Sequence, residues 1–478
     1  MKPVQPNPAA LSHRAVARRH RSRGAVQHES RWLAYGLALV LVVPLAADGA
    51  NSALLSAAAS ILYLGWSATA FLRVSGSPAV LRRMAPVVIP LVLFLLWTAA
   101  PLYRGLARDI VPAPLDPDLL GIVWCHAAAL VAVLLGCGLA GRLRGFTRDA
   151  ATGLCVCAAL LMVATLLLRA FGEPGVAGSM IAQRDHRFTG LVGNANAAGI
   201  SFGMISLVMT GVARDRWERW RGRSGAYPPL AIPAAVIGAV VALVLVALTQ
   251  SRAAFGATVL AQAVYALPRR PGLDRPPVSP RHRAVALLAL ALGAAAVWLA
   301  ATSVLTRYAI ADLDGPGRVA VLRHYFALAR DVPLSGYGLG GFDRFNQRHL
   351  TPDTVLLVGD FGAAHNAPLQ LVIEAGWPAL ALVAIALLGI GSHIVRTRDA
   401  IRAPIARAML LAVGVAGVGS MIDIALNVPA IAALTAALLG LVWGRALGDA
   451  AADPPGSTSS PQRETPAAAP WPTPDMRN

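Results

Sequence analysis

The chain alternates long apolar runs with short polar loops, and nearly every second loop is crowded with arginine. A helix needs about 20 apolar residues to cross a bilayer, and cytoplasmic loops carry an excess of basic residues. This alternation is therefore typical of a multi-spanning membrane protein with one basic side. The basic loops contain Arg73, Arg82 and Arg83; Arg142, Arg144 and Arg148; Arg214 to Arg223; Arg269 to Arg283; and Arg396 to Arg407.

Composition agrees with a membrane protein. Of the 478 residues, 56% are hydrophobic and only 14% are charged, whereas soluble domains carry about 25% charged residues. The net charge of +18 does not indicate a nucleic-acid partner, because the basic residues are spread over loops between apolar runs instead of gathering on one folded face. The four cysteines all fall inside apolar runs, where small packing residues are expected: Cys125, Cys137, Cys155 and Cys157.

The sequence predicts an all-α polytopic integral membrane protein with about twelve transmembrane helices. A basic cytoplasmic segment, residues 1–31, precedes a membrane domain over residues 32–447, and residues 448–478 form a predicted disordered cytoplasmic tail. The first apolar run resembles a signal-peptide core, but the long basic segment before it favours an uncleaved span. The predicted spans are residues 32–48, 51–72, 84–103, 119–140, 150–171, 190–213, 230–248, 252–267, 284–305, 365–388, 408–427 and 429–447.

An even number of spans places both termini and every basic loop in the cytoplasm. The longest loop, residues 306–364, then faces outward. It follows the ninth predicted span and no internal repeat is visible, which weighs against a transporter built from two matched halves. Inside this loop, residues 317–330 predict an amphipathic helix that lies against the spans. Its predicted apolar stripe is Val319, Leu322 and Phe326.

Several arginines depart from this distribution because the predicted topology places them on the outer side: Arg187, Arg252, Arg318 and Arg323. Arg252 interrupts an apolar hairpin, where a guanidinium costs about 2.5–3.5 kcal/mol at mid-span on insertion scales. A bound phosphate or a carboxylate partner would offset that cost, and arginine binds phosphate bidentately. The sequence therefore predicts an outward-facing anion site. For Arg318 taken alone, a solvated or headgroup-facing charge is an equal alternative.

His365 lies at the outer edge of the tenth predicted span, which also contains the acid Glu374. Ionisable groups at membrane depth are costly and tend to be functional. A neutral imidazole accepts a proton from a hydroxyl group, so His365 is a candidate general base. The glycine-rich segment before it, residues 333–342, lacks the Gly-Lys-Ser/Thr ending of a phosphate-binding loop and predicts a tight structural turn.

These segments resemble the O-antigen ligase and polymerase family of bacterial envelope enzymes. The resemblance covers residues 187–388, and the flanking spans match only in number and hydrophobicity. One departure is Ala195, because the family often has proline between the two asparagines that flank it. Asn194 and Asn196 therefore have packing of the helix start as an alternative role. The matching segments are Arg187 to Asn196, Ser251 to Phe255, Gly317 to Phe342 and Ala364 to Gly376.

The resemblance implies a glycosyltransferase of the bacterial inner membrane that needs no cofactor or metal. It would move a glycan from a polyprenyl-diphosphate carrier to an acceptor hydroxyl on the outer side, the acceptor being a growing glycan, lipid A core or a protein. The alternatives are a flippase for an anionic lipid-linked glycan and a protein O-oligosaccharyltransferase. The implied site consists of His365 as base, Arg252, Arg187, Arg318 and Arg323 for the diphosphate, and Asn194, Asn196, Asn366 and Glu374 in support.

Overall fold

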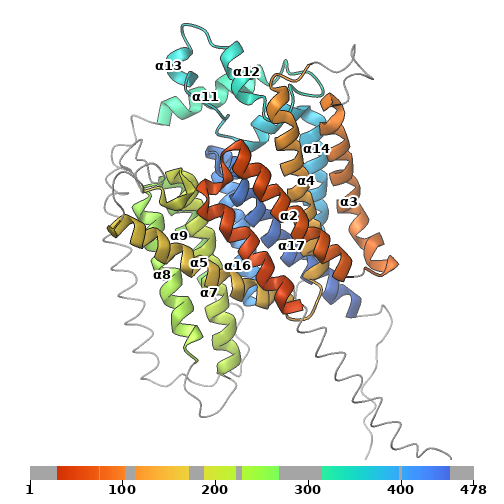
Figure 1. The fold of residues 1–478 in the computed structure, drawn as a ribbon, viewed down its shortest axis with the longest axis vertical. Helices are drawn as coiled ribbons and strands as arrows, with labels where there is room; N and C mark the ends of the chain where they lie inside the picture. The colour runs from red at the N-terminus through yellow and green to blue at the C-terminus, as the bar shows by residue number, and fades with distance from the viewer. Residues whose placement is uncertain are drawn as a thin grey trace, which may run out of the picture.

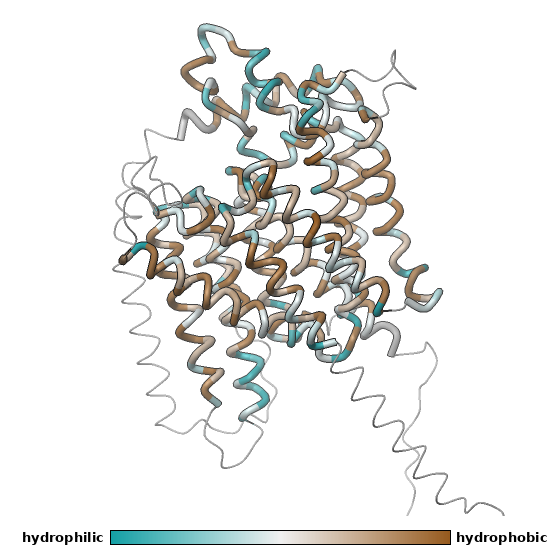
Figure 2. The backbone as a smooth tube through the Cα atoms, viewed as in Figure 1, coloured by the Kyte–Doolittle hydropathy of each residue, from teal (hydrophilic) through white to brown (hydrophobic). Residues whose placement is uncertain are grey.

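The computed structural model describes residues 30–74, 76–102, 113–171, 188–221, 229–267, 315–397 and 401–452, without the side chains of residues 315–318 and 449–452. In this part of the chain the regular elements are helices. They form one bundle with a layer of short helices at one end (Figure 1). Apolar residues cover most of the bundle, while hydrophilic residues gather in the short-helix layer and at the far end of α7 (Ala195–Trp220) (Figure 2).

Nine helices among the described residues are long and apolar enough to cross a membrane, which confirms the predicted all-helical polytopic class. The predicted spans 32–48 and 252–267 appear as shorter helices, Ser30–Ala46 and α9 (Arg252–Ala266). The predicted span 284–305 lies outside the described residues, so the count of twelve stays a prediction. The nine helices are α2 (Ala53–Arg73), α3 (Pro78–Ala99), α4 (Pro117–Ala140), α5 (Phe146–Phe171), α7, α8 (Ala231–Leu248), α14 (Ala367–Arg396), α16 (Pro404–Ile422) and α17 (Pro429–Ala452).

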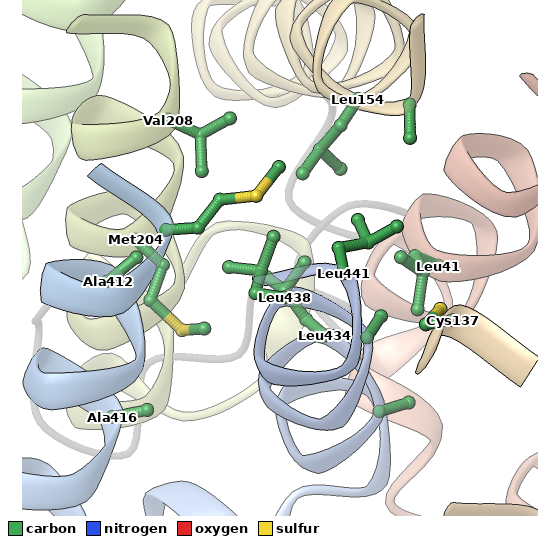
Figure 3. Close-up of a cluster of buried hydrophobic side chains, with 14 of the residues drawn as sticks. Leu41, Cys137, Leu154, Met204, Val208, Ala412, Ala416, Leu434, Leu438 and Leu441 are labelled. Atoms are coloured by element: carbon green, nitrogen blue, oxygen red, sulfur yellow. The ribbon is translucent and has the colours of Figure 1, made fainter. Parts of the chain in front are cut away.

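The helices α7 and α17 form the centre of the bundle. Of their most apolar stretches 89% and 78% are buried, against 39% for most other spans, whose outer faces are left for lipid. Leucines at spacings of four and three residues lie on one face of α17 and pack towards α4, α5, α7 and the helix Ser30–Ala46 (Figure 3). The helix α17 ends at Ala452, which is beyond residue 448, where the sequence predicts a disordered tail.

The end of the bundle away from the short-helix layer is named the basic end, because arginines of several predicted cytoplasmic loops meet there. Asp215, near the end of α7, binds Arg148 in the first turn of α5 at 3.1 Å. Asp149 lies 3.7 Å from Arg31, in the first turn of the helix Ser30–Ala46. Arg407 of α16 donates to a backbone carbonyl near the end of α9. Loops far apart in sequence thus share one end of the bundle, as the arginine distribution predicts.

The opposite end, named the loop end, carries the short-helix layer: α11 (Gly315–Leu328), α12 (Phe342–Arg348) and α13 (Val355–Val358). This layer has its own small core, which continues into the first turns of α14. The ring of Tyr325 meets that of Phe342 edge-on at 5.1 Å, and the Tyr325 hydroxyl donates to Asn346 Oδ1 at 2.9 Å. The Asn346 amide in turn donates to the carbonyls of Val358 and Phe361. Asn346 therefore joins the elements of the layer.

The predicted outer-loop helix is present as α11, but its predicted apolar stripe is not the packed face. Val319, Leu322 and Phe326 are 58%, 44% and 47% exposed, whereas Val321 and Tyr325 are buried. The prediction of the packed face was wrong because apolar residues lie on several sides of α11, so spacing alone does not select a face. The short-helix core selects the face that carries Tyr325.

Candidate active site

A break in α14 shapes the loop end. Gly376 has φ 78° and ψ 171°, outside helical geometry, and Pro378 two residues later has no N–H to donate to the carbonyl four residues before it. The carbonyls of residues 373–375 therefore lose their helical partners. In a bilayer such groups need partners from within the protein.

Each of these carbonyls receives a donor from another part of the chain. Two backbone donors come from the glycine-rich segment: Tyr337 N–H donates to Ile373 O at 3.0 Å, and Gly338 N–H to Glu374 O at 2.8 Å. The indole of Trp97 in α3 donates to Ala375 O at 2.9 Å. The glycine-rich segment is therefore a turn packed into the break of α14.

Glycine is required where this turn meets the helix. Gly336 has φ 69°, and a Cβ atom there would lie 2.3 Å from the carbonyl carbon of Glu374. A Cβ on Gly376 would lie 1.8 Å from Leu334 O. The two backbones thus approach so closely that neither position accepts a side chain without a shift of the main chain.

The Glu374 side chain is 7% exposed and holds the same turn. Its carboxylate accepts from the backbone N–H groups of Gly340 and Phe342 and from Gln370 Nε2 at 3.0 Å. Hydrogen bonds from these donors offset the cost of removing the carboxylate from water, as a nearby cation would. The sequence singled out Glu374 as an acid at membrane depth, and the structure places it as the anchor of the turn.

His365 lies directly before α14 with φ 54°, a left-handed conformation that histidine adopts more readily than most residues. Its Nδ1 lies 2.9 Å from Ala363 O. Because a carbonyl only accepts, Nδ1 carries the proton and Nε2 of the neutral ring keeps its lone pair. The ring also packs against Phe361, with centroids 4.5 Å apart. The imidazole is thus fixed in orientation and tautomer while remaining partly exposed.

Gln370, one turn into α14, connects His365 to the rest of the loop end. Its Oε1 accepts from the Ala364 N–H at 3.2 Å and from Asn427 Nδ2 at 2.5 Å, while its Nε2 donates to Glu374. One amide therefore ties the backbone next to His365 to Glu374 and to the segment between α16 and α17. Neither Gln370 nor Asn427 was predicted as a site residue from the sequence.

The asparagines predicted as supporting residues are helix caps and bridges. Asn366 caps α14 through Leu369 N–H at 3.0 Å and donates to the Met421 carbonyl at 2.8 Å. Asn194 caps α7, accepting from the backbone N–H groups of residues 196 and 197. Asn196 donates from its side chain to Asp423 Oδ2. This geometry agrees with the alternative role of Asn194, packing of the helix start, and its role as a supporting residue of the site stays a prediction.

Asp423 is a further polar residue of the site that the sequence analysis missed. It is 4% exposed, follows α16, and accepts from Asn196 and from the backbone N–H of Ile424. A signal was available, because Asp423 is the sole charged residue between Arg407 and Arg445. The polar side chains that lie at this end of the bundle and connect α7, α14 and the segment after α16 are named the loop-end cluster: Asn196, His365, Asn366, Gln370, Glu374, Asp423 and Asn427.

Arg252 is the first residue of α9, after a turn in which Ser251 caps the helix through Ala254 N–H. This turn packs on Gly199 of α7, where a Cβ would lie 2.8 Å from Thr249 Oγ1. Gly199 is about one helical turn from Asn196. The structure therefore brings the start of α9 to the part of α7 that contributes to the loop-end cluster. Arg252 itself is partly buried.

The other predicted arginines are placed less completely. Arg323 lies on α11 and is exposed to solvent. Arg318 belongs to the first turns of α11, but its side chain lies outside the description, and Arg187 lies outside the described residues. Within the described part of the chain, no group of three or more His, Cys, Asp or Glu side chains is arranged to hold a metal ion.

Fold and site together define a polytopic helical membrane protein with a fixed imidazole and a polar cluster at one end. The O-antigen ligase family model matches residues 237–384, which include Arg252, the short-helix layer and His365. Over these residues the chain is similar to the O-antigen ligase family, which confirms the resemblance. A search of curated proteins finds no match. The family match supports a function in membrane glycan transfer, with a lipid-linked glycan and an acceptor as partners.

Proposed function

We propose that this protein transfers a glycan from a polyprenyl-diphosphate carrier to an acceptor hydroxyl, as an O-antigen ligase or polymerase does. The observation that carries the proposal is the state of His365. Its Nδ1–H is committed to Ala363 O, so Nε2 is the ring nitrogen left to accept a proton. General bases of this kind need a fixed orientation and an available lone pair.

In the proposed reaction, Nε2 of His365 takes the proton of the acceptor hydroxyl while that oxygen attacks the anomeric carbon of the donor glycan. The bond between the anomeric carbon and the diphosphate oxygen breaks, and polyprenyl diphosphate leaves with the bonding electrons. Arg252 and Arg187, with Arg318 and Arg323 in support, stabilise the negative charge on the leaving diphosphate. No metal takes part in the proposed step.

We place the site on the extracytoplasmic side of the bacterial inner membrane, with both termini in the cytoplasm. The support is the meeting of Arg31, Arg148 and Arg407 with their partners at the basic end, because basic residues favour the cytoplasmic side. The loop end is then the outer one. The proposed acceptors are a growing polysaccharide, lipid A core or a protein hydroxyl.

The test is glycan transfer by purified protein in proteoliposomes that contain a polyprenyl-diphosphate-linked oligosaccharide and one candidate acceptor at a time. We expect product with the wild type and none with His365→Ala or Arg252→Ala. Two variants at the loop end serve as controls. His349→Ala removes another imidazole and Arg330→Ala removes another guanidinium, and both should retain transfer. The acceptor that becomes modified identifies the ligase, polymerase or protein-modifying type.

Two results would contradict the proposal. Full transfer by His365→Ala would show that His365 is not the general base of the proposed reaction. If no acceptor is modified, but the donor crosses the bilayer and Arg252→Ala stops the crossing, the protein is a flippase for lipid-linked glycans and no transferase.

A further inference from the structure

An open cavity of about 350 Å³ lies at the loop end between α12 and the start of α4. Its lining consists of Leu115, Asp116, Arg344, Gln347 and Arg348. Its size falls in the range of small-ligand pockets, roughly 300–1,000 Å³. None of these residues belongs to the loop-end cluster or to the proposed diphosphate site.

The cavity presents more positive than negative charge. Arg344 and Arg348 are four residues apart on α12, so their side chains leave the same face of the helix. Asp116 is the single acid in the lining, and its two oxygens are already engaged. Oδ1 caps α4 through Leu119 N–H at 3.1 Å, and Oδ2 faces Arg344 Nε at 3.7 Å.

Arg348 pairs with no carboxylate in the part of the chain that the structure describes, and the Arg344 contact is long and exposed, with the arginine 66% accessible. An exposed pair of this kind contributes little to stability. Two guanidinium groups on one face of a pocket therefore remain able to bind an oxyanion, with Gln347 beside them as a neutral hydrogen-bonding group.

The opposite face of α12 connects this cavity to His365. Phe342 and Phe345 pack into the short-helix core, and Asn346 donates to the carbonyl of Phe361, whose ring packs on His365. The cavity and His365 therefore belong to one packed part of the structure, and their relative position is fixed. A long ligand that binds in the cavity would be held in a constant position relative to His365.

We propose that this cavity is a second subsite, which binds an anionic group, phosphate or carboxylate, carried by a glycan that the protein uses as a substrate. Arg344 and Arg348 provide the charge-assisted hydrogen bonds, and Asp116 orients Arg344. That the ligand is a substrate glycan rests on the proposed transferase function. The cavity and its charge do not.

The test measures binding of glucose 6-phosphate, with glucose as the neutral comparison, to purified protein in phosphatidylcholine nanodiscs by saturation-transfer NMR. Glucose 6-phosphate should bind and glucose should not. The variant R344Q/R348Q should weaken binding roughly tenfold or more, because two charge-assisted hydrogen-bonding groups are lost. R348Q alone should weaken it while leaving the contact between Arg344 and Asp116. The matched control is R330Q, which removes an exposed arginine of the same layer outside the cavity.

Unchanged binding by R344Q/R348Q, or no binding by the wild type, would overturn the subsite. Nanodiscs with phosphatidylglycerol distinguish the source of the anion. If this lipid abolishes binding of glucose 6-phosphate to the wild type, headgroups occupy the cavity and the glycan assignment is wrong. His365→Ala should bind glucose 6-phosphate like the wild type, so a failure of transfer and a failure of the subsite are separate results.

Discussion

At the scale of single residues, the site depends on polar side chains that hydrogen-bond to one another and to the backbone. In the part of the chain that the structure describes, the buried Glu374 carboxylate has no ion-pair partner, and its oxygens accept from Gln370, Gly340 and Phe342. Such an arrangement tolerates the loss of an acceptor poorly, because each donor is then left buried without a partner. The backbone next to His365 is joined to this network through Gln370, which accepts from the Ala364 N–H.

We expect Glu374→Gln to reduce the free energy of unfolding by about 1–3 kcal/mol. The substitution replaces one accepting oxygen with an NH2 group, which cannot accept a hydrogen bond from the backbone N–H that it would meet. The measurement is unfolding in mixed micelles, followed by circular dichroism. Asp353→Asn, at an exposed position in the same layer, makes the same chemical change and should have no measurable effect. Equal stability of the two variants would show that the Glu374 contacts contribute nothing.

His324 on α11 predicts a pH dependence of the short-helix layer. Burial and then the positive charge of His349 hold the pKa of His324 below its usual value. The unfolded chain therefore takes up the proton at higher pH than the folded layer does. The contribution of His324 to the free energy of unfolding should be fully present above the pKa of about 6.5 in the unfolded chain. It should fall as the pH decreases from there towards the lower pKa of the folded state.

Thermal unfolding at pH 7.5, 6.0 and 5.0 checks this expectation. His324→Leu should flatten the loss of stability between neutral and acidic pH, and His349→Gln should flatten it in part, because one of the two causes of the shift is removed. An unaltered pH profile in His324→Leu would assign the dependence to other groups.

At the scale of elements, the break in α14 and the glycine-rich turn depend on each other. We expect Gly336→Ala to be strongly destabilising, because the new Cβ would meet the backbone of Glu374 at 2.3 Å in a position with φ 69°. Left-handed backbone costs a residue with a side chain about 1–2 kcal/mol, and overpacking adds roughly 1–3 kcal/mol. Gly362→Ala is the matched control, because a Cβ there meets no atom within 4 Å. The comparison is the folded yield and the unfolding midpoint of the two variants.

Helix existence was more predictable from the sequence than helix faces or ends. The hairpin turn before Arg252 was predicted from a polar interruption of an apolar run, and α8 and α9 flank it as expected. The packed face of α11 was not predictable, because Val319 and Val321 are the same residue type and only the tertiary core distinguishes the exposed one from the buried one. Similarly, the break at Gly376 depends on donors from Tyr337 and Trp97, which local spacing does not reveal.

At the scale of the whole molecule, topology brings dispersed residues together. Alternation of spans is enough to predict that Asn196, Arg252 and His365 lie towards the same end of the bundle. It does not predict their partners. The contacts of Gln370, Asp423 and Asn427 depend on the packing of α7, α14 and the connection between α16 and α17, because each residue binds a residue from a different helix or connection.

The sidedness of the bundle is open to direct measurement in cells. The basic end is expected in the cytoplasm because arginine is retained on that side during insertion, which leaves the loop end outside. In a background with the natural cysteines replaced by alanine, Asp353→Cys at the loop end should react with a membrane-impermeant maleimide in intact spheroplasts. Arg144→Cys, on the exposed turn between α4 and α5, should react only after the membrane is permeabilised. The reverse pattern would place the loop-end cluster in the cytoplasm. Labelling of both positions in intact spheroplasts would mean that the two ends are not separated by a bilayer.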